Sequence, residues 1–129
     1  MVIKKNKILL VLLSLMFCIV RAQKSNIYIA PIDATTPYSI SCSNLLDAFP
    51  ETIKKIKLND KQSKEIYLLT SVLKKNDNKP YTNIRYKGEI CFNKKRFNFC
   101  GDQASILING QYYETSKDLF EYIKKLRKK

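Results

Sequence analysis

The chain has 129 residues, a formal net charge of +13 and no histidine. It therefore lacks the commonest general base and the usual partner of a serine or cysteine nucleophile, and mixed Cys–His zinc sites are excluded. Its three glycines are too dispersed for a loop that cradles phosphate. We expect no catalytic residue, no metal site and no cofactor, and the positive charge favours an acidic partner or surface.

The first 22 residues have the pattern of a secretory signal peptide. Lys4, Lys5 and Lys7 form a basic start, and residues 8–20 are almost wholly apolar. We expect cleavage before Gln23, which lowers the net charge from +13 to +9 because the leader holds four basic residues and no acid. The sequence thus predicts a protein that is secreted or periplasmic, with one domain at residues 23–129.

Two other interpretations of the leader are open. An uncleaved leader would anchor the protein in a membrane, although its apolar run is short for a span of ~20 residues. A lipoprotein leader would use Cys18 as the lipidated residue, but Phe17 stands where a small residue is required. Apart from such an anchor, we expect only transient contact with a membrane.

The first half of the exported part alternates short strands and helices. The segment Asn26–Ile29 is typical of a strand, and the polar segment Asp33–Ser41 of a loop. A short helix is predicted over Asn44–Phe49, with Ser41 or Ser43 as its cap.

A strand over Ile53–Leu58 and a longer helix follow. The helix is predicted over Lys61–Lys75, with Asn59 or Asp60 as its cap. Its apolar stripe comprises Ile66, Leu69, Val72 and Leu73, and Lys74 and Lys75 belong to its last turn. Residues 76–80 then break the pattern.

Residues 84–113 read as three or four strands joined by tight turns. One face of the first strand carries Ile84, Tyr86, Gly88, Ile90 and Phe92; the opposite face carries Arg85, Lys87, Glu89, Cys91 and Asn93. After a turn near Lys94–Lys95, Phe97 and Phe99 return to the apolar face. Opposing Phe92 to Phe99 also opposes Cys91 to Cys100, whereas a two-residue slip opposes Phe92 to Phe97, and patterning alone does not choose. Asn109–Gly110 predicts a second hairpin, between residues 106–108 and 111–113.

The exported part holds three cysteines, which allow one disulfide and one leftover thiol. We favour Cys91–Cys100, because one hairpin register places them directly opposite. Cys42 is the alternative partner for either. The leftover thiol would be buried or would pair between molecules.

A final helix begins at Thr115 or Ser116 and buries Leu119, Phe120, Ile123 and Leu126. The fold class is therefore α+β: a small antiparallel sheet of about four to five strands, with two longer helices and one short helix packed on one face. The stripes of the two longer helices should meet a common set of sheet residues, which comprises Ile90, Phe92, Phe97, Phe99 and Ile106.

The function predicted is an exported, non-enzymatic binding or inhibitory module that acts through a protein surface. Its proposed contact residues are Lys94, Lys95, Arg96, Tyr112 and Tyr113. The alternative is an electrostatic binder of anionic glycan or of a membrane surface. Nucleic acid is not expected, because the hairpin's aromatic rings point inward, where they cannot stack on bases. A remote third hypothesis is a hydrolase that uses two of four carboxylates, Asp33, Asp47, Glu51 and Glu89.

Overall fold

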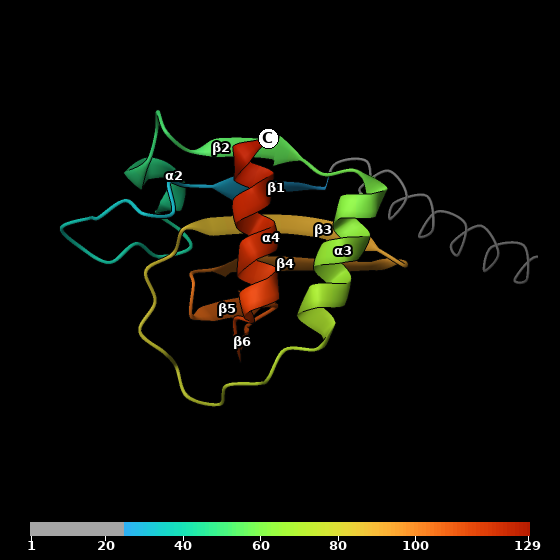
Figure 1. Ribbon diagram of the computed structural model, residues 1–129. Helices are drawn as coiled ribbons and strands as arrows, with labels where there is room; N and C mark the ends of the chain where they lie inside the picture. The colour runs from blue at the N-terminus through green and yellow to red at the C-terminus, as the bar shows by residue number, and fades with distance from the viewer. Residues whose placement is uncertain (1–24) are drawn as a thin grey trace, which may run out of the picture.

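The computed structural model describes residues 25–129. The signal peptide predicted at residues 1–22, its cleavage site and the lipoprotein cysteine lie outside the described residues. The elements, in chain order, are β1 (Asn26–Ile29), α2 (Leu45–Ala48), β2 (Lys54–Lys57), α3 (Asp60–Ser71), β3 (Tyr86–Phe92), β4 (Lys95–Gly101), β5 (Ser105–Ile108), β6 (Gln111–Glu114) and α4 (Lys117–Lys128). This order confirms the predicted α+β class (Figure 1).

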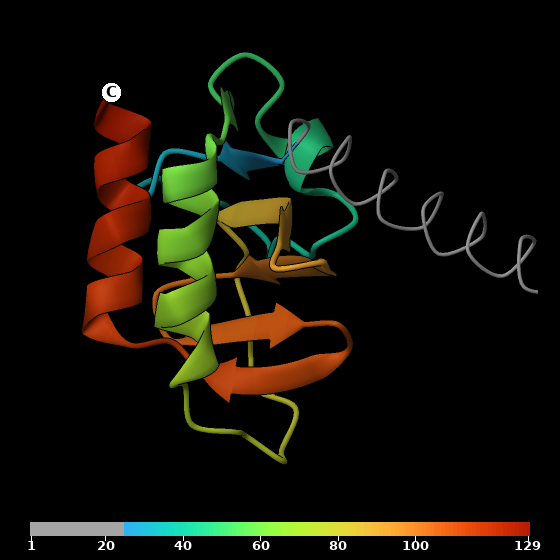
Figure 2. The same cartoon turned by 90° about the vertical axis from the view of Figure 1, so that its right-hand side faces the viewer.

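The strands form one antiparallel sheet of six, in the order β2-β1-β3-β4-β5-β6, which is more than the four to five predicted. The helices α3 and α4 lie side by side on one face (Figure 2). Their buried residues Ile66, Leu119 and Ile123 join Ile90, Phe97, Phe99 and Ile106 of the sheet in the main hydrophobic cluster. Four of the five predicted sheet residues are thus confirmed as core residues, while Phe92 is half-buried against the ring of Tyr67.

The short helix α2 lies on the other face, so the prediction that all three helices share one face is wrong. Its Leu45 belongs to a second cluster with Ile40, Ile84 and Cys100. Because Cys100 is adjacent in β4 to Phe99, its side chain points to the face opposite the two long helices. Strand alternation assigns residues to faces, but it does not say which face a connecting segment covers.

The β3–β4 hairpin adopts neither predicted register. Phe92 lies opposite Lys95, Ile90 opposite Phe97 and Gly88 opposite Phe99. The turn is Asn93–Lys94, where both residues have positive φ (53° and 62°), the combination that a type I′ turn requires. Asn93 is a residue type that favours this turn, but lysine, unlike glycine, rarely adopts a positive φ. The sequence therefore signals only the first of the two turn positions. The second hairpin turn, Asn109–Gly110, has φ values of 47° and 86° and is confirmed.

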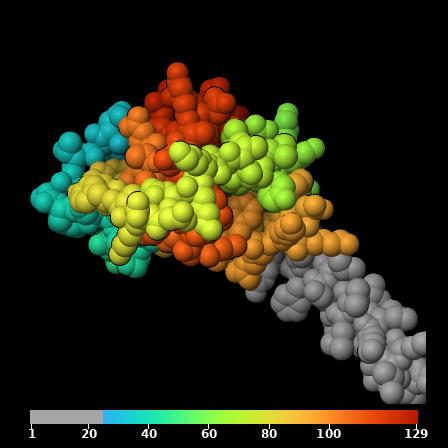
Figure 3. Space-filling model, turned by 90° about the horizontal axis from the view of Figure 1, so that it is seen from below, coloured from blue at the N-terminus to red at the C-terminus, as the bar shows by residue number. Residues whose placement is uncertain are grey.

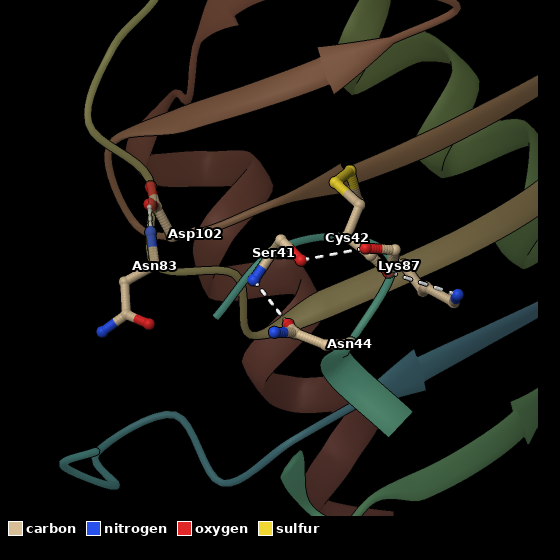
Figure 4. The surroundings of a disulfide bond; sticks show 8 residues. Ser41, Cys42, Asn44, Asn83, Lys87 and Asp102 are labelled. Atoms are coloured by element: carbon tan, nitrogen blue, oxygen red, sulfur yellow. Dashed lines mark hydrogen bonds between the residues drawn. A yellow bond between two sulfur atoms is a disulfide. The ribbon is translucent and has the colours of Figure 1, made fainter. Parts of the chain in front are cut away.

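The disulfide joins Cys42 to Cys100, with Cα atoms 6.0 Å apart. The favoured pair Cys91–Cys100 is therefore wrong, because the register places Cys91 opposite Arg96 and Cys100 opposite Lys87. The bridge fastens the segment before α2 to the centre of the sheet (Figure 4). No free cysteine is present in the part of the chain that the structure describes, so the expected leftover thiol is not found.

The helix α3 ends at Ser71, four residues earlier than predicted. The hydroxyls of Thr70 and Ser71 donate to backbone carbonyls three residues back, and Val72 is 80% exposed. The chain beyond runs along the outer edge of β6, where Lys74 accepts a hydrogen bond from the N–H of Glu114. This edge pairing replaces the last predicted helical turn.

The helix α4 follows its prediction closely. The side chain of Ser116 caps it by accepting a hydrogen bond from the N–H of Leu119. All four residues of its predicted stripe are buried. Its C-terminal end lies over β2 (Figure 1), where Lys54 Nζ donates to the carbonyl of Arg127 at 2.8 Å.

The assignment of the core face can be tested at two phenylalanines. Phe99→Ala should lower the free energy of unfolding by about 3–5 kcal/mol, since its ring is buried and lies against Gly88. Phe92→Ala is the matched control and should cost about 1–2 kcal/mol, because that ring is half-buried. Urea unfolding measures both, and equal losses would contradict the assignment.

The disulfide offers a second test. Replacing both Cys42 and Cys100 by serine should destabilise the protein by about 4 kcal/mol, because the bridge joins residues 58 apart and restricts the unfolded chain. Urea unfolding of the double variant and of the oxidised parent gives the difference. An unchanged midpoint would show that α2 is held without the bridge.

Candidate functional site

Three of the five residues predicted to contact a partner line one groove. Lys95, Arg96 and Tyr113 border a hollow of about 440 Å³ between the end of α3 and the strands β4–β6. We call it the α3–β6 groove. Its other lining residues are Tyr67, Thr70, Ser71, Leu73, Phe97, Ile108 and Asn109.

The groove exists because α3 stops before it has crossed the sheet. Phe97, Ile108 and Tyr113 point to the helix face and form an apolar floor. Tyr67 forms the wall, with its ring centre 6.2 Å from that of Phe97. The chain that follows α3 lies against the β5–β6 hairpin, along the outer edge of β6, as the view from below shows (Figure 3).

The charges around the groove are fewer than the basic hairpin suggested. Lys95 is exposed at its rim. Arg96 borders the groove, but its guanidinium forms an ion pair with Glu89 on the opposite face of the sheet. Lys94 lies in the turn, and Tyr112, next to Tyr113 in β6, points to the other face. Neither of these last two lines the groove.

Exposed apolar side chains continue the surface beyond the groove. Leu68 is 48% exposed, and Val72, at the end of α3, is 80% exposed. Val72 directly precedes Leu73, which lines the groove. The apolar floor of the groove and these exposed aliphatic residues lie close together at the end of α3.

A second hollow, of about 500 Å³, lies on the opposite face of the sheet beside the disulfide. Its polar groups already serve the fold. Lys87 Nζ donates to the carbonyl of Cys42 at 3.3 Å (Figure 4), and Asn109 Oδ1 accepts the N–H of Asn98. We therefore do not take this hollow as the candidate site.

A third hollow contains a buried arginine and a carboxylate. Arg85 is buried; it donates to the carbonyl of Ala34 and to Asn83 Oδ1, and its guanidinium lies 5.3 Å from the ring centre of Phe49. Burial lowers the pKa of Arg85, and the charge of Asp102 partly offsets this. Arg85 thus ties the loop after β1 to the sheet.

Sequence reasoning missed Asp102. One oxygen of its carboxylate accepts the N–H of Asn83 (Figure 4), and the other accepts the N–H groups of Ala104 and Ser105. Its carbonyl accepts the hydroxyl of Tyr86 at 3.2 Å. The only signal was an aspartate after a glycine, which is common in turns.

The structure places the four carboxylates of the hydrolase hypothesis on the surface or in an ion pair. Asp33, Asp47 and Glu51 are exposed on different segments, and Glu89 is paired with Arg96. Within residues 25–129, no three His, Cys, Asp or Glu side chains are grouped so that they could hold a metal ion. No helix in that range is long and apolar enough to cross a membrane.

Comparison with known proteins gives no relative. No protein-family model matches the chain, and no curated protein or solved structure is significantly similar to it.

The buried tyrosine beside Asp102 predicts a pH dependence. Desolvation raises the pKa of Tyr86 above its ordinary value of 10.0, because the folded protein disfavours the phenolate. The unfolded chain ionises this group near pH 10. The contribution of Tyr86 to stability should therefore be constant below that pH and should fall as the pH rises above it. Urea unfolding between about pH 8 and about pH 11, a range that includes the ordinary pKa of tyrosine, should show a smaller fall in stability for Tyr86→Phe than for the parent. Equal falls would contradict this role for Tyr86.

Proposed function

We propose that this protein is an exported, non-enzymatic binding or inhibitory module that acts through a protein surface, and that the α3–β6 groove receives an apolar side chain of its partner. One observation carries the proposal. Lys95 and Tyr113, which the sequence singled out for separate reasons, border the same groove, and the floor of that groove is apolar.

The chemistry of the groove specifies the partner. Tyr67, Phe97, Ile108 and Tyr113 offer an apolar and aromatic lining, of the kind that the centres of protein interfaces contain. The volume of about 440 Å³ is within the range of sites that hold small ligands or large side chains. Lys95 at the rim favours an acidic group next to the inserted side chain.

The sequence supports the exported setting of this proposal through the leader pattern at residues 1–22. A domain outside the cytoplasm that carries a disulfide is well suited to an oxidising compartment. Binding to a partner would also account for Leu68 and Val72, whose exposure contributes nothing to the stability of the domain alone.

The groove can be tested by capture of the partner with paired variants. Tagged parent protein is incubated with the cell-envelope and secreted fractions, in parallel with Val72→Asp, Tyr113→Ser and Tyr112→Ser. A stoichiometric partner should be recovered by the parent and by Tyr112→Ser, which changes the opposite face of the same strand. Val72→Asp and Tyr113→Ser should lose it, since they introduce a polar group where the partner packs. Circular dichroism confirms that each variant is folded.

The outcomes separate the protein partner from the electrostatic alternative. Recovery of the partner by all variants would exclude the α3–β6 groove. If nothing stoichiometric is recovered and the parent instead binds heparin or anionic vesicles in a salt-sensitive way, the alternative of an anionic glycan or membrane ligand replaces this proposal.

A further inference from the structure

The outer edge of β2 is the open end of the sheet. At the other end, the outer edge of β6 is already paired: Lys74 accepts the N–H of Glu114, and Asn76 donates to the carbonyl of Tyr112. No described strand pairs with the outer edge of β2. Among the described residues, only the edge of β2 therefore has room for a further strand.

The pattern of backbone hydrogen bonds between β1 and β2 shows which backbone groups of β2 point away from the sheet. The N–H of Leu58 donates to the carbonyl of Ser25, so Ile56 and Lys54 also exchange backbone hydrogen bonds with β1. Lys55 and Lys57 lie at the alternate positions, and their N–H and carbonyl groups point away from the sheet. These groups are placed to pair with an incoming strand, and both residues are exposed.

Cations flank this edge on both faces of the sheet. Lys55 and Lys57 point to the face away from α4, where Lys55 Nζ lies 5.6 Å from the ring centre of Tyr28. On the other face, Lys54 Nζ holds the carbonyl of Arg127, and Arg127 Nη2 donates to the carbonyl of Thr52. The last turn of α4, which contains Lys125, Arg127 and Lys128, is thereby fixed beside β2. None of these cations forms a salt bridge within the described chain.

We propose that the edge of β2 binds an extended acidic segment of a partner protein, which adds a seventh strand to the sheet. Main-chain hydrogen bonds to Lys55 and Lys57 would hold the segment. Its side chains alternate between the two faces and would meet cations on both, so acidic residues are favoured on either face of the segment.

The same cations exclude the commonest wrong partner of an open edge. Lysines on an edge strand oppose pairing with a second copy of the chain, which would bring like charges together. An acidic strand relieves this repulsion, so the edge discriminates by charge rather than by shape. This inference is independent of the α3–β6 groove, which lies at the other end of the sheet.

The test uses a defined probe, an acetylated and amidated peptide of four Glu-Thr repeats, titrated into ¹⁵N-labelled protein. The expected result is a set of chemical-shift changes centred on the amides of Lys55 and Lys57. The Lys-Thr peptide should not bind. The Glu-Thr peptide N-methylated at every residue should bind about tenfold more weakly, because it keeps its charge but has no residue N–H left to donate to the edge.

Variants separate the backbone contribution from the charge. Lys57→Pro removes an outward N–H and should weaken binding about tenfold, while Lys57→Gln keeps that N–H and should weaken it less. Raising the ionic strength from about 0.01 M to about 0.15 M shortens the Debye length from about 30 Å to about 8 Å and should also weaken binding. Val72→Asp, next to the α3–β6 groove, should bind the peptide as the parent does, so the two proposals can fail separately.

Three results would overturn the proposal. Equal affinity for the N-methylated peptide would show that no strand is added. Shifts confined to the α3–β6 groove would place the peptide elsewhere. Tighter binding to phosphatidylglycerol vesicles than to the peptide, with shifts along the solvent face of α4, would assign these cations to a membrane surface instead.

Discussion

Through its carboxylate and its backbone carbonyl, Asp102 joins three separate stretches of the chain. The carboxylate accepts the N–H of Asn83 before β3 and the N–H groups of Ala104 and of Ser105, the first residue of β5. Its backbone carbonyl accepts the hydroxyls of Tyr86 and of Thr115, which directly precedes the cap of α4. Hydrogen bonds from N–H groups to a carboxylate are stronger than those between neutral groups. This junction lies directly before α4 and connects the start of that helix to the segment that enters β3.

The two faces of the sheet are covered by different means. Helix α3 and helix α4 cover one face by burying apolar stripes, which suits elements with a regular period. The other face receives an irregular segment with a four-residue helix, and a disulfide to Cys100 and hydrogen bonds from the buried Arg85 fasten it there. This segment has no regular apolar face, and the point attachments add to the burial of Ile40, Leu45 and Phe49 in the second cluster. The α3–β6 groove arises where the first kind of cover stops early.

Neighbouring residues were sufficient to predict an element wherever the chain keeps one regular pattern, the two-residue alternation of a strand, the three- and four-residue spacing of a helix, or a turn dipeptide. The bounds of β1, the stripe of α4 and the Asn109–Gly110 turn could all be predicted from neighbouring residues. The β3–β4 register could not, because Lys94 adopts a positive φ without any residue type that signals it. Nor could the end of α3, since Val72 and Leu73 continue the helical period while the backbone that follows gains partners on β6. The disulfide and the role of Asp102 depend on contacts between distant segments, which a local pattern does not contain. For the groove, the sequence pointed to both Tyr112 and Tyr113, but these neighbours in β6 face opposite sides of the sheet and only Tyr113 lines the groove.

The distribution of charge is the clearest example of a property that depends on contacts between distant segments. Along the sequence, residues 94–96 are the densest basic run of the sheet, yet Arg96 is neutralised by Glu89 and Lys94 is held in a turn. The fold instead gathers cations at the edge of β2, where the hydrogen bond from Lys54 to Arg127 joins residues 73 apart. Cations beside exposed backbone donors and acceptors act differently from cations on a loop tip. They repel a like-charged strand at the distance at which backbone pairing begins, and they attract an acidic one at that same distance. An edge of this kind can remain unpaired in a concentrated solution of its own copies and still be available to a partner of opposite charge.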